Sequence, residues 1–421
     1  MQLGIIADDF TGATDVAGFL VAAGVRTTQL VGVPADDRHF EAEGASQAIV
    51  ISLKSRSCPP EQAVRHSCAA LAWLQRHGAH RIYQKYCSTF DSTTDGNIGP
   101  VADALMDRLE ADVTVVCPAL PVNGRTIYHG YLFVNGVLLE ETGMRHHPIT
   151  PMTDSHLGRL MEAQSRGRAG VVPADVVDAG ATAVRREIDT LAGAGIRYVV
   201  LDALRSEHLD TLARAVRDLP LTTGGSGLAA ALARACVDDR IDPVEAAAAG
   251  RPDAGPAVIL SGSCSDMTRA QVRHYAEAAP AVAMDVDRCL DAPAYARELA
   301  GWVQDHQSSR HAPLVYATTD PGTLQEIQRR MGPDAGEAVE RTFASLARLL
   351  ADAGTTRFIV AGGETSGAVV DALGVDGFHV GPQIAPGVPW VRSIDGSYSM
   401  ALKSGNFGSE RFFFDCQRDV P

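Results

Sequence analysis

The chain opens with a short apolar pattern that runs directly into a pair of acids. Leu3–Ala7 predicts a buried strand, and Asp8 and Asp9 follow it at once. A helix is expected next, because apolar residues recur at the i, i+4 and i+7 positions from Val16. Open α/β sheets place their ligands at such strand-to-helix corners. The alternative is that the acids only interact favourably with the positive end of the helix dipole. One acid would be enough for that purpose, and this corner has a third, Asp15.

The length and composition predict a two-domain globular enzyme. At 421 residues the chain exceeds what one hydrophobic core usually serves. No apolar run reaches the roughly 18 residues of a membrane span, and the early strand leaves no room for a signal peptide. The eight cysteines stand singly, which fits a reducing cytoplasm. The formal charge of −14 disfavours nucleic acid as a partner but allows a small anion in a local basic pocket.

Lysine is scarce, which draws attention to each one. Of the 37 basic residues three are lysines, Lys54, Lys85 and Lys403, so 34 are arginines. All three lie in polar stretches rich in glycine or serine, next to predicted strands, and not on amphipathic helix faces. We therefore expect them to have functional roles.

The N-terminal half alternates strand and helix patterns, which predicts a mostly parallel sheet. The candidate strands are Leu3–Ala7, Ile49–Leu53, Arg81–Lys85, Val113–Cys117 and Tyr198–Asp202. Because the carboxyl ends of parallel strands line one edge, the basic groups that follow them should meet the N-terminal acids. Those groups are Lys54 or Arg56, Lys85 and Arg125. This constellation suits a small polyhydroxy carboxylate.

Three further segments of the first half have recognisable patterns. Tyr128–Glu141 predicts a β-hairpin turned at Asn135-Gly136. In the loop that follows, Arg145 and His146 are candidates for substrate contact, and the alternative of a metal site at the paired histidines has no second ligand at suitable spacing. Thr222–Gly227 is a glycine-rich turn into a helix, which suits either an anion site or a tight turn with a helix cap.

The C-terminal part repeats the alternation after a linker at Arg251–Pro256, which divides the chain into domains 1–250 and 256–421. Its expected strands are Ala257–Leu260, Val282–Val286, Leu314–Ala317 and Arg357–Ala361. The loops are built from glycine and serine at 261–265 and 362–367, with a helix expected over Ala368–Leu373, and again at 403–408. Such loops let the backbone approach phosphates and predict a nucleotide site. The chain has no GxxxxGK[ST] and no clean GxGxxG, so neither a P-loop nor a dinucleotide fold is expected.

The segment Asp8–Asp15, taken with Gly362–Gly367 far downstream, resembles the four-carbon acid sugar kinase family over essentially the whole chain. The resemblance implies two α/β domains with mostly parallel sheets and an active site in the cleft between them. It also implies an ATP-dependent kinase that phosphorylates the 4-hydroxyl of a four-carbon sugar acid, with ATP and Mg²⁺ as cofactors. The implied substrate is 3-oxo-tetronate, with D-threonate or D-erythronate as alternatives.

The candidate site residues combine the patterns with this resemblance. The catalytic candidates are Asp8, Asp9, Lys85 and Arg125, with Asp9 favoured over Asp8 as general base. The substrate-binding candidates are Asp8, Asp9, Lys54, Arg56, Lys85, Asp91, Asn123, Arg125, Arg145 and His146. The ATP-binding candidates are Ser261, Gly262, Ser263, Gly362, Gly363, Glu364, Thr365, Ser366, Lys403 and Gly405. No metal ligand is assigned.

Two other functions compete with the kinase. A sugar-acid lyase or aldolase would use Lys85 as an amine nucleophile, but it gives the glycine loops of the second half no function. A non-catalytic sensor of sugar acid and nucleotide gains nothing from an acid pair placed as a base. The expected partners are the sugar acid and ATP, without nucleic acid or membrane, and assembly into a homo-oligomer is the alternative to a monomer.

Overall fold

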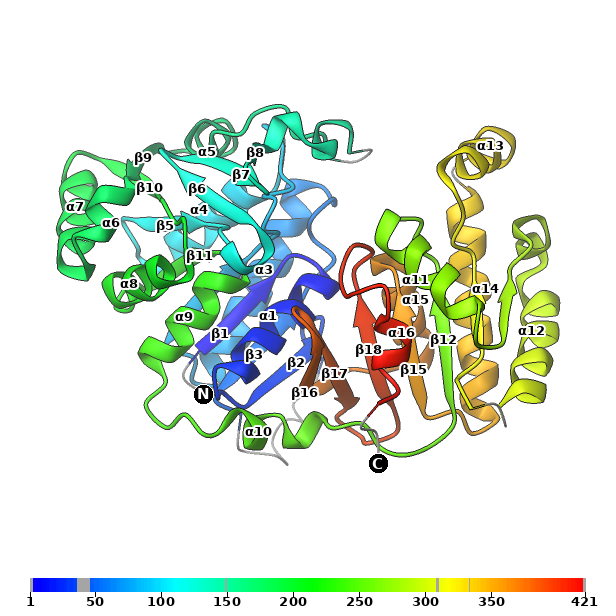
Figure 1. Cartoon of the computed structure of the whole chain (residues 1–421). Coiled ribbons are helices and arrows are strands. Elements are labelled where there is room, and N and C mark those ends of the chain that lie inside the picture. The colour runs from blue at the N-terminus through cyan, green and yellow to red at the C-terminus, as the bar shows by residue number, and fades with distance from the viewer. Residues whose placement is uncertain (1–2, 36–45, 148–149, 308–309, 333, 419–421) are drawn as a thin grey trace. The chain divides into compact units, whose positions relative to one another are not determined.

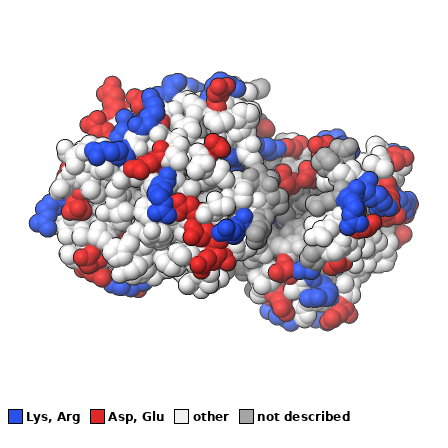
Figure 2. Space-filling model, turned by 90° about the horizontal axis from the view of Figure 1, so that it is seen from above, with Lys and Arg blue, Asp and Glu red and all other residues white. Residues whose placement is uncertain are grey.

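The computed structural model describes residues 3–35, 46–147, 150–307, 310–332 and 334–418 (Figure 1). Its contacts divide the chain into two compact units, Met1–Ala246 and Ala247–Pro421. The division falls just before the linker that the sequence suggests. No helix of the described ranges is long and apolar enough to cross a bilayer. On the face shown in Figure 2, acidic and basic side chains are interspersed among uncharged ones.

The first unit is built on a parallel sheet with helices on both faces (Figure 1). Its strands run in the order β2-β3-β1-β4-β11-β5-β10-β9. They are β1 (Leu3–Ala7), β2 (Thr27–Val31), β3 (Ala48–Ser52), β4 (Arg81–Lys85), β5 (Thr114–Cys117), β9 (Arg168–Val172), β10 (Ile196–Leu201) and β11 (Leu221–Gly224). The helices are α1 (Phe10–Ala22), α3 (Pro60–Arg76), α4 (Ile98–Leu109), α5 (Leu157–Gln164), α6 (Ala174–Asp178), α7 (Ala181–Gly193), α8 (Ser206–Val216), α9 (Ser226–Cys236) and α10 (Pro243–Ala246).

Strand β1 lies between β3 and β4 and fixes where the polar loops begin. Its five residues are all buried and pair in parallel with both neighbours, so that Ala7 lies level with Ser52 and Lys85. Just beyond this edge the backbone N–H of Asp8 bonds to the carbonyl of Lys85, and that of Ser55 bonds to the carbonyl of Asp8. The ends of three strands are thereby tied together, as the sequence predicts for a parallel sheet.

Most predicted strands of this unit are confirmed, but one predicted turn is wrong. Thr222–Gly224 belongs to β11, where it pairs with β4 and β5. Two β-branched, buried threonines favour a strand even with glycine beside them. The helix α9 then begins at Ser226, two residues before the predicted start. Strands β2 and β9 were not predicted from the sequence.

A small antiparallel sheet follows β5 and a short 3-10 turn, η1 (Pro121–Asn123). It comprises β6 (Arg125–Tyr128), β7 (Tyr131–Val134) and β8 (Val137–Leu138). Asn135 and Gly136 have φ values of 51° and 81°, which the predicted type I′ turn requires. A second turn with positive φ, at His129-Gly130, was not predicted. The 3-10 segments η2 (Leu139–Glu141) and η3 (Gly143–His146) come next.

The second unit has a mixed sheet in the order β13-β14-β12-β15-β18-β17-β16. The strands β12 (Ala257–Ser261), β13 (Ala281–Ala283), β14 (Leu314–Tyr316), β15 (Arg357–Ala361) and β18 (Ser399–Lys403) are parallel, and β17 (Val388–Ser393) and β16 (Gly377–Ala385) are antiparallel to their neighbours. The helical segments are η4 (Ala248–Gly250), α11 (Asp266–Ala276), η5 (Val286–Asp291), α12 (Ala292–His306), α13 (Pro321–Met331), α14 (Asp334–Asp352), α15 (Gly363–Leu373) and α16 (Phe412–Asp415). Both units are thus α/β with mostly parallel sheets, which confirms the predicted fold class.

Two predictions for this unit need correction. The strand expected over Val282–Val286 ends at Ala283, because Asp285 caps the following η5 turn. The predicted glycine loop at 362–367 is mostly helix, since α15 begins at Gly363 and not at Ala368. Gly362, with φ at 126°, is its cap and a position where other residues are strained.

Candidate active site

The acid pair lies where β1 passes into α1. Asp9 is the cap of α1, and its Oδ1 accepts the backbone N–H of Gly12 at 2.9 Å. The carbonyl of Asp8 accepts the backbone N–H groups of Ser55 and Arg56, which follow β3. The local backbone therefore presents two carboxylates and an arginine at one edge of the sheet.

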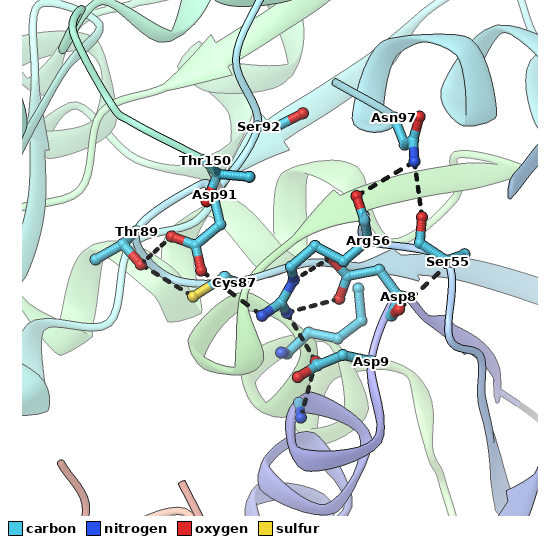
Figure 3. A network of polar contacts seen from close by, with 12 residues as sticks. Asp8, Asp9, Ser55, Arg56, Cys87, Thr89, Asp91, Ser92, Asn97 and Thr150 are labelled. Atoms are coloured by element: carbon cyan, nitrogen blue, oxygen red, sulfur yellow. Dashed lines mark hydrogen bonds and ion pairs between the residues drawn. The ribbon is translucent and has the colours of Figure 1, made fainter. Parts of the chain in front are cut away.

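The Arg56 guanidinium connects three carboxylates (Figure 3). Its Nε and one Nη2 proton bind both oxygens of Asp8 at 2.9 Å, and Nη2 also donates to Oδ1 of Asp9 at 2.7 Å. Its Nη1 lies 3.6 Å from Oδ2 of Asp91. Burial alone lowers the pKa of Arg56, but the carboxylates of Asp8 and Asp9 outweigh it and hold that pKa well above the ordinary value. The group is a permanent cation inside an acidic cluster.

Asp91 is held in a strained loop after β4. Phe90 and Asp91 have φ values of 64° and 31°, in the left-handed region that such residues rarely adopt. Oδ1 of Asp91 accepts the hydroxyl of Thr89 at 2.7 Å, and that hydroxyl lies 3.0 Å from the thiol of Cys87. Backbone strain of this kind is typical of functional sites.

Asn97 fixes the loop that carries Arg56, although it is not among the residues predicted from the sequence. Its side-chain amide donates to the carbonyls of Ser55 at 2.8 Å, Arg56 at 3.2 Å and Cys58 at 2.7 Å. Asn97 lies directly before α4, a position that suggests a helix cap, and no local pattern points to contacts some forty residues away.

The two acids of the pair differ in their free lone pairs. Both oxygens of Asp8 are engaged by Arg56, whereas Oδ2 of Asp9 accepts no hydrogen bond from the described part of the chain. Burial raises the pKa of Asp9, Arg56 opposes this, and the neighbouring Asp8 adds to it, so that the pKa is above 3.8. Asp9 is therefore the carboxylate with both a free oxygen and enhanced basicity.

Lys85 and Arg125 are the two other predicted catalytic cations. Lys85 ends β4 with its side chain 2% exposed, and its Nζ lies 3.9 Å from Oδ2 of Asp15. Arg125 begins β6 and donates to the carbonyl of Asn123 in the half-buried η1 turn. The Nε of Arg125 is buried without a hydrogen-bond partner among the described residues.

The sequence also predicts substrate contacts for Lys54, Arg145 and His146. Lys54 is exposed. Arg145 is exposed as well, and it donates to the carbonyl of Glu140 at 3.4 Å. The side chain of His146 lies outside the described part of the chain. Contact of these three residues with the substrate stays a prediction.

Of the paired histidines that suggest a metal alternative, His147 has a described side chain and His146 has not. Nδ1 of His147 is 3.0 Å from the hydroxyl of Thr150 and accepts its backbone N–H at 3.1 Å. Within the described ranges, no group of three or more His, Cys, Asp or Glu side chains is placed to hold a metal ion.

The second unit has a pocket of about 370 Å³ at the start of α15. Its polar rim includes six predicted nucleotide residues together with Thr319 and Glu340. The six are Gly262, Ser263, Gly362, Gly363, Glu364 and Thr365. Its apolar wall includes Val286, Leu324, Ile327 and Val339. The N–H groups of the first turn of α15 have no helical partners and point to this rim, which suits an anion. The pocket thus joins an anion-binding end to an apolar wall.

Four predicted nucleotide residues lie behind this rim and not on it. Ser261 is fully buried, and its hydroxyl lies 2.8 Å from that of Thr318. Ser366 is also fully buried, on the inner side of α15. A Cβ on Gly405 would come within 2.5 Å of the hydroxyl of Ser263, so the backbone of Gly405 packs directly against this residue of the rim.

The fourth is Lys403, whose ammonium group is bound within the protein. It ends β18 at 0% exposure and donates to the hydroxyl of Thr268 at 3.0 Å and to the carbonyls of Ser404 at 3.0 Å and Gly405 at 2.9 Å. Three acceptors satisfy all three donors of an ammonium group. Burial lowers the pKa of Lys403 to about 7. The prediction of a direct nucleotide contact is therefore replaced by a role in holding the 404–405 loop.

Comparison with known proteins assigns the family. Residues 3–232 match the model described as the sugar-binding N-terminal domain, and residues 258–413 match the nucleotide-binding C-terminal domain. The chain belongs to the four-carbon acid sugar kinase family, which confirms the resemblance seen in its sequence motifs.

Individual relatives cover the chain from end to end. A 3-oxo-tetronate kinase of Brucella melitensis biotype 1 is 59% identical over 99% of this chain and 95% of its own length. A 3-oxo-tetronate kinase of Pectobacterium atrosepticum is 55% identical over 100% of this chain and 99% of its own. A solved structure from Salmonella typhimurium LT2, described as a candidate tRNA synthase, is 53% identical over 100% of both chains with a TM-score of 0.91.

The contact between Gly12 and the acid pair gives a first prediction. A Cβ at position 12 would overlap Oδ1 of Asp9 and lie 3.0 Å from Nζ of Lys85. Gly12→Ala should therefore displace the carboxylate and lower kinase turnover by about tenfold or more, while the helix keeps its stability. Steady-state kinetics and a thermal melt measure the two effects.

Gly193→Ala is the matched control, because Gly193 ends α7 and a Cβ added there would meet no heavy atom within 4 Å. Parental turnover in Gly12→Ala would show that the position of Asp9 does not matter.

Proposed function

We propose that the chain is an ATP-dependent kinase that transfers a phosphoryl group to the 4-hydroxyl of 3-oxo-tetronate. The observation that carries this proposal is the full-length similarity to relatives named 3-oxo-tetronate kinase. The sugar acid is assigned to residues 1–250 and the nucleotide to residues 256–421, in keeping with the descriptions of the two matched family models.

Asp9 is the general base in this proposal. Phosphoryl transfer needs a group that orients the attacking hydroxyl and takes its proton. Oδ2 of Asp9 is free for that hydroxyl, while its Oδ1 is held by Gly12 and Arg56. Asp8, with both oxygens on Arg56, keeps the guanidinium in place.

Lys85 and Arg125 are the cations left for the substrate. The donors of Arg56 are directed to protein carboxylates, so it contributes little to binding an external one. The Nε of Arg125 is buried without a hydrogen-bond partner among the described residues. The ammonium group of Lys85 lies 3.9 Å from Asp15, and its charge also acts on Asp9. Both are suited to the substrate carboxylate or to the transferring phosphoryl group.

The α15 pocket suits ATP. The phosphates would accept hydrogen bonds from the backbone N–H groups of Gly363 and Glu364, and the apolar wall would cover the adenine ring. Mg²⁺ usually binds one or two carboxylates together with substrate phosphates, and the exposed Glu364 at the rim fits such a site. Bound there, the ion would neutralise charge on the phosphate oxygens.

A coupled ADP-release assay tests the function. The enzyme should release ADP with 3-oxo-tetronate, and ³¹P NMR should locate the new phosphate on C4. D-Threonate and D-erythronate serve as competing acceptors. Faster turnover with either of them would transfer the assignment to that acid, and no ADP release with any acceptor would contradict the kinase proposal.

Asp9→Asn tests the base. The amide keeps the hydrogen-bonding shape but cannot take a proton, so turnover should fall by about a hundred- to ten-thousand-fold. Because burial raises the pKa of Asp9 above 3.8, the parental rate should fall as the pH drops through that raised value. Single-turnover rates across pH measure both effects, with the exposed Asp112→Asn as control. An Asp9→Asn variant within tenfold of the parental rate would exclude Asp9 as base.

Gly363→Asp tests the phosphate cradle. A carboxylate at the first turn of α15 is compatible with the helix but repels phosphates, so ATP should bind at least about tenfold more weakly. Gly363→Asn has the same size without the charge and should bind ATP much better than the Asp variant. Equal ATP affinity of these two variants in a titration would show that the phosphates lie elsewhere.

A further inference from the structure

Asp15, the third acid of the N-terminal motif, is not used by the mechanism above. It lies on α1 and is 8% exposed. Its Oδ2 accepts a hydrogen bond from the hydroxyl of Ser226. Ser226 is the first residue of α9, at the end of the glycine-rich segment that the sequence marked as a candidate anion site. The anion that this helix start faces is a carboxylate of the protein itself.

Asp15 also pairs with Lys85, one of the two cations assigned to the substrate. Nζ of Lys85 lies 3.9 Å from its Oδ2. Burial raises the pKa of Asp15, and the charges of Lys85 and Arg125 oppose this effect. The other oxygen of Asp15, Oδ1, is buried without a hydrogen-bond partner in the described part of the chain. A buried carboxylate thus pairs with a buried ammonium, whose charge also acts on Asp9.

The surroundings leave little room for Lys85 to move away. A Cβ on Gly12 would be 3.0 Å from its Nζ, so the ammonium lies against the backbone of α1. Its side chain is 2% exposed. Without a counter-charge, a buried ammonium is strongly unfavourable and would turn or draw in water.

We propose that Asp15 is a positioning residue that, anchored by Ser226, holds Lys85 toward the sugar acid. This role rests on the kinase function proposed above. Asp15 does not touch the substrate and is not a second base. It sets the direction of the positive charge that the substrate meets.

Asp15→Asn removes the charge and keeps a carbonyl for the Ser226 hydroxyl. The kcat/KM for the sugar acid should fall at least about thirtyfold, the loss typical of breaking a buried charge pair. The KM for ATP should stay within about twofold, since the nucleotide is assigned to the other unit. Ser226→Ala, which leaves the charge in place, should show a smaller loss of the same kind.

Asp103→Asn is the matched control. Asp103 is another buried carboxylate of this unit, and it accepts the Tyr198 hydroxyl at 2.5 Å and the backbone N–H of Arg166 at 2.8 Å. Its loss should lower the melting temperature without changing kcat/KM. If Asp15→Asn behaved in the same way, Asp15 would be a structural residue and the proposal would fail.

A second measurement does not depend on activity. The chain has three lysines, so ¹³Cε labelling gives three assignable lysine signals, with Lys85→Arg identifying one. In Asp15→Asn the Lys85 signal should shift and sharpen as the side chain becomes mobile, while that of Lys403 stays unchanged. An unmoved Lys85 signal would overturn the proposal. Failure of the parent to phosphorylate any sugar acid would instead refute the kinase function and leave this signal to decide the role of Asp15.

Discussion

The geometry of the sugar-acid site depends on the Arg56 guanidinium. Three carboxylates, those of Asp8, Asp9 and Asp91, converge on it from the segments that follow β1 and β4. Without a central cation, like charges this close would disfavour ionisation of one another, and a protonated Asp9 could not act as a base. The bidentate pair with Asp8 also fixes the direction of the guanidinium plane. One side chain therefore offsets the negative charge of the three acids and holds them in place.

This arrangement divides the cations of the site into two groups. Arg56 is satisfied by protein carboxylates and serves the catalytic acids. Two other cations retain capacity for an incoming anion. Lys85 pairs with the buried Asp15, and the Nε of Arg125 has no hydrogen-bond partner among the described residues. A chain with a net charge of −14 can thus bind a sugar acid, because the local balance of charge differs from the total.

The sequence predicts the site edge because the geometry of parallel sheets is regular. Strands that start in register end in register, so the polar residues that follow β1, β3 and β4 meet wherever the loops are short. The pairing of Asp15 with Ser226 is different, since it joins positions 211 apart through the packing of α1 on α9. No local pattern encodes such a contact.

In the second unit, tertiary packing outweighs what the local sequence patterns indicate. Glycine weakens helices, so 362–367 indicates a loop, yet α15 begins at Gly363 because tertiary packing outweighs a loss of about 1 kcal/mol per glycine. Lys403 resembles a phosphate ligand by composition, but three acceptors of its own chain hold it. Whether Lys403 contacts a phosphate or the protein itself depends on its burial. Lys403 is buried because β18 lies inside the sheet, and the sequence does not predict that strand.

The most direct measurement of the central role of Arg56 is the kinetics of Arg56→Lys. An ammonium group keeps the charge but cannot bind Asp8 with two parallel bonds and reach Asp9 as well. We predict that kcat falls about a hundredfold while the KM for the sugar acid changes less than about threefold, because the acids move and the substrate cations do not. The control is Arg65→Lys at an exposed position of α3, which should leave kcat and the KM for the sugar acid at their parental values. A folded Arg56→Lys variant with parental kcat and a KM raised tenfold or more would contradict this role, since Arg56 would then bind the substrate carboxylate itself.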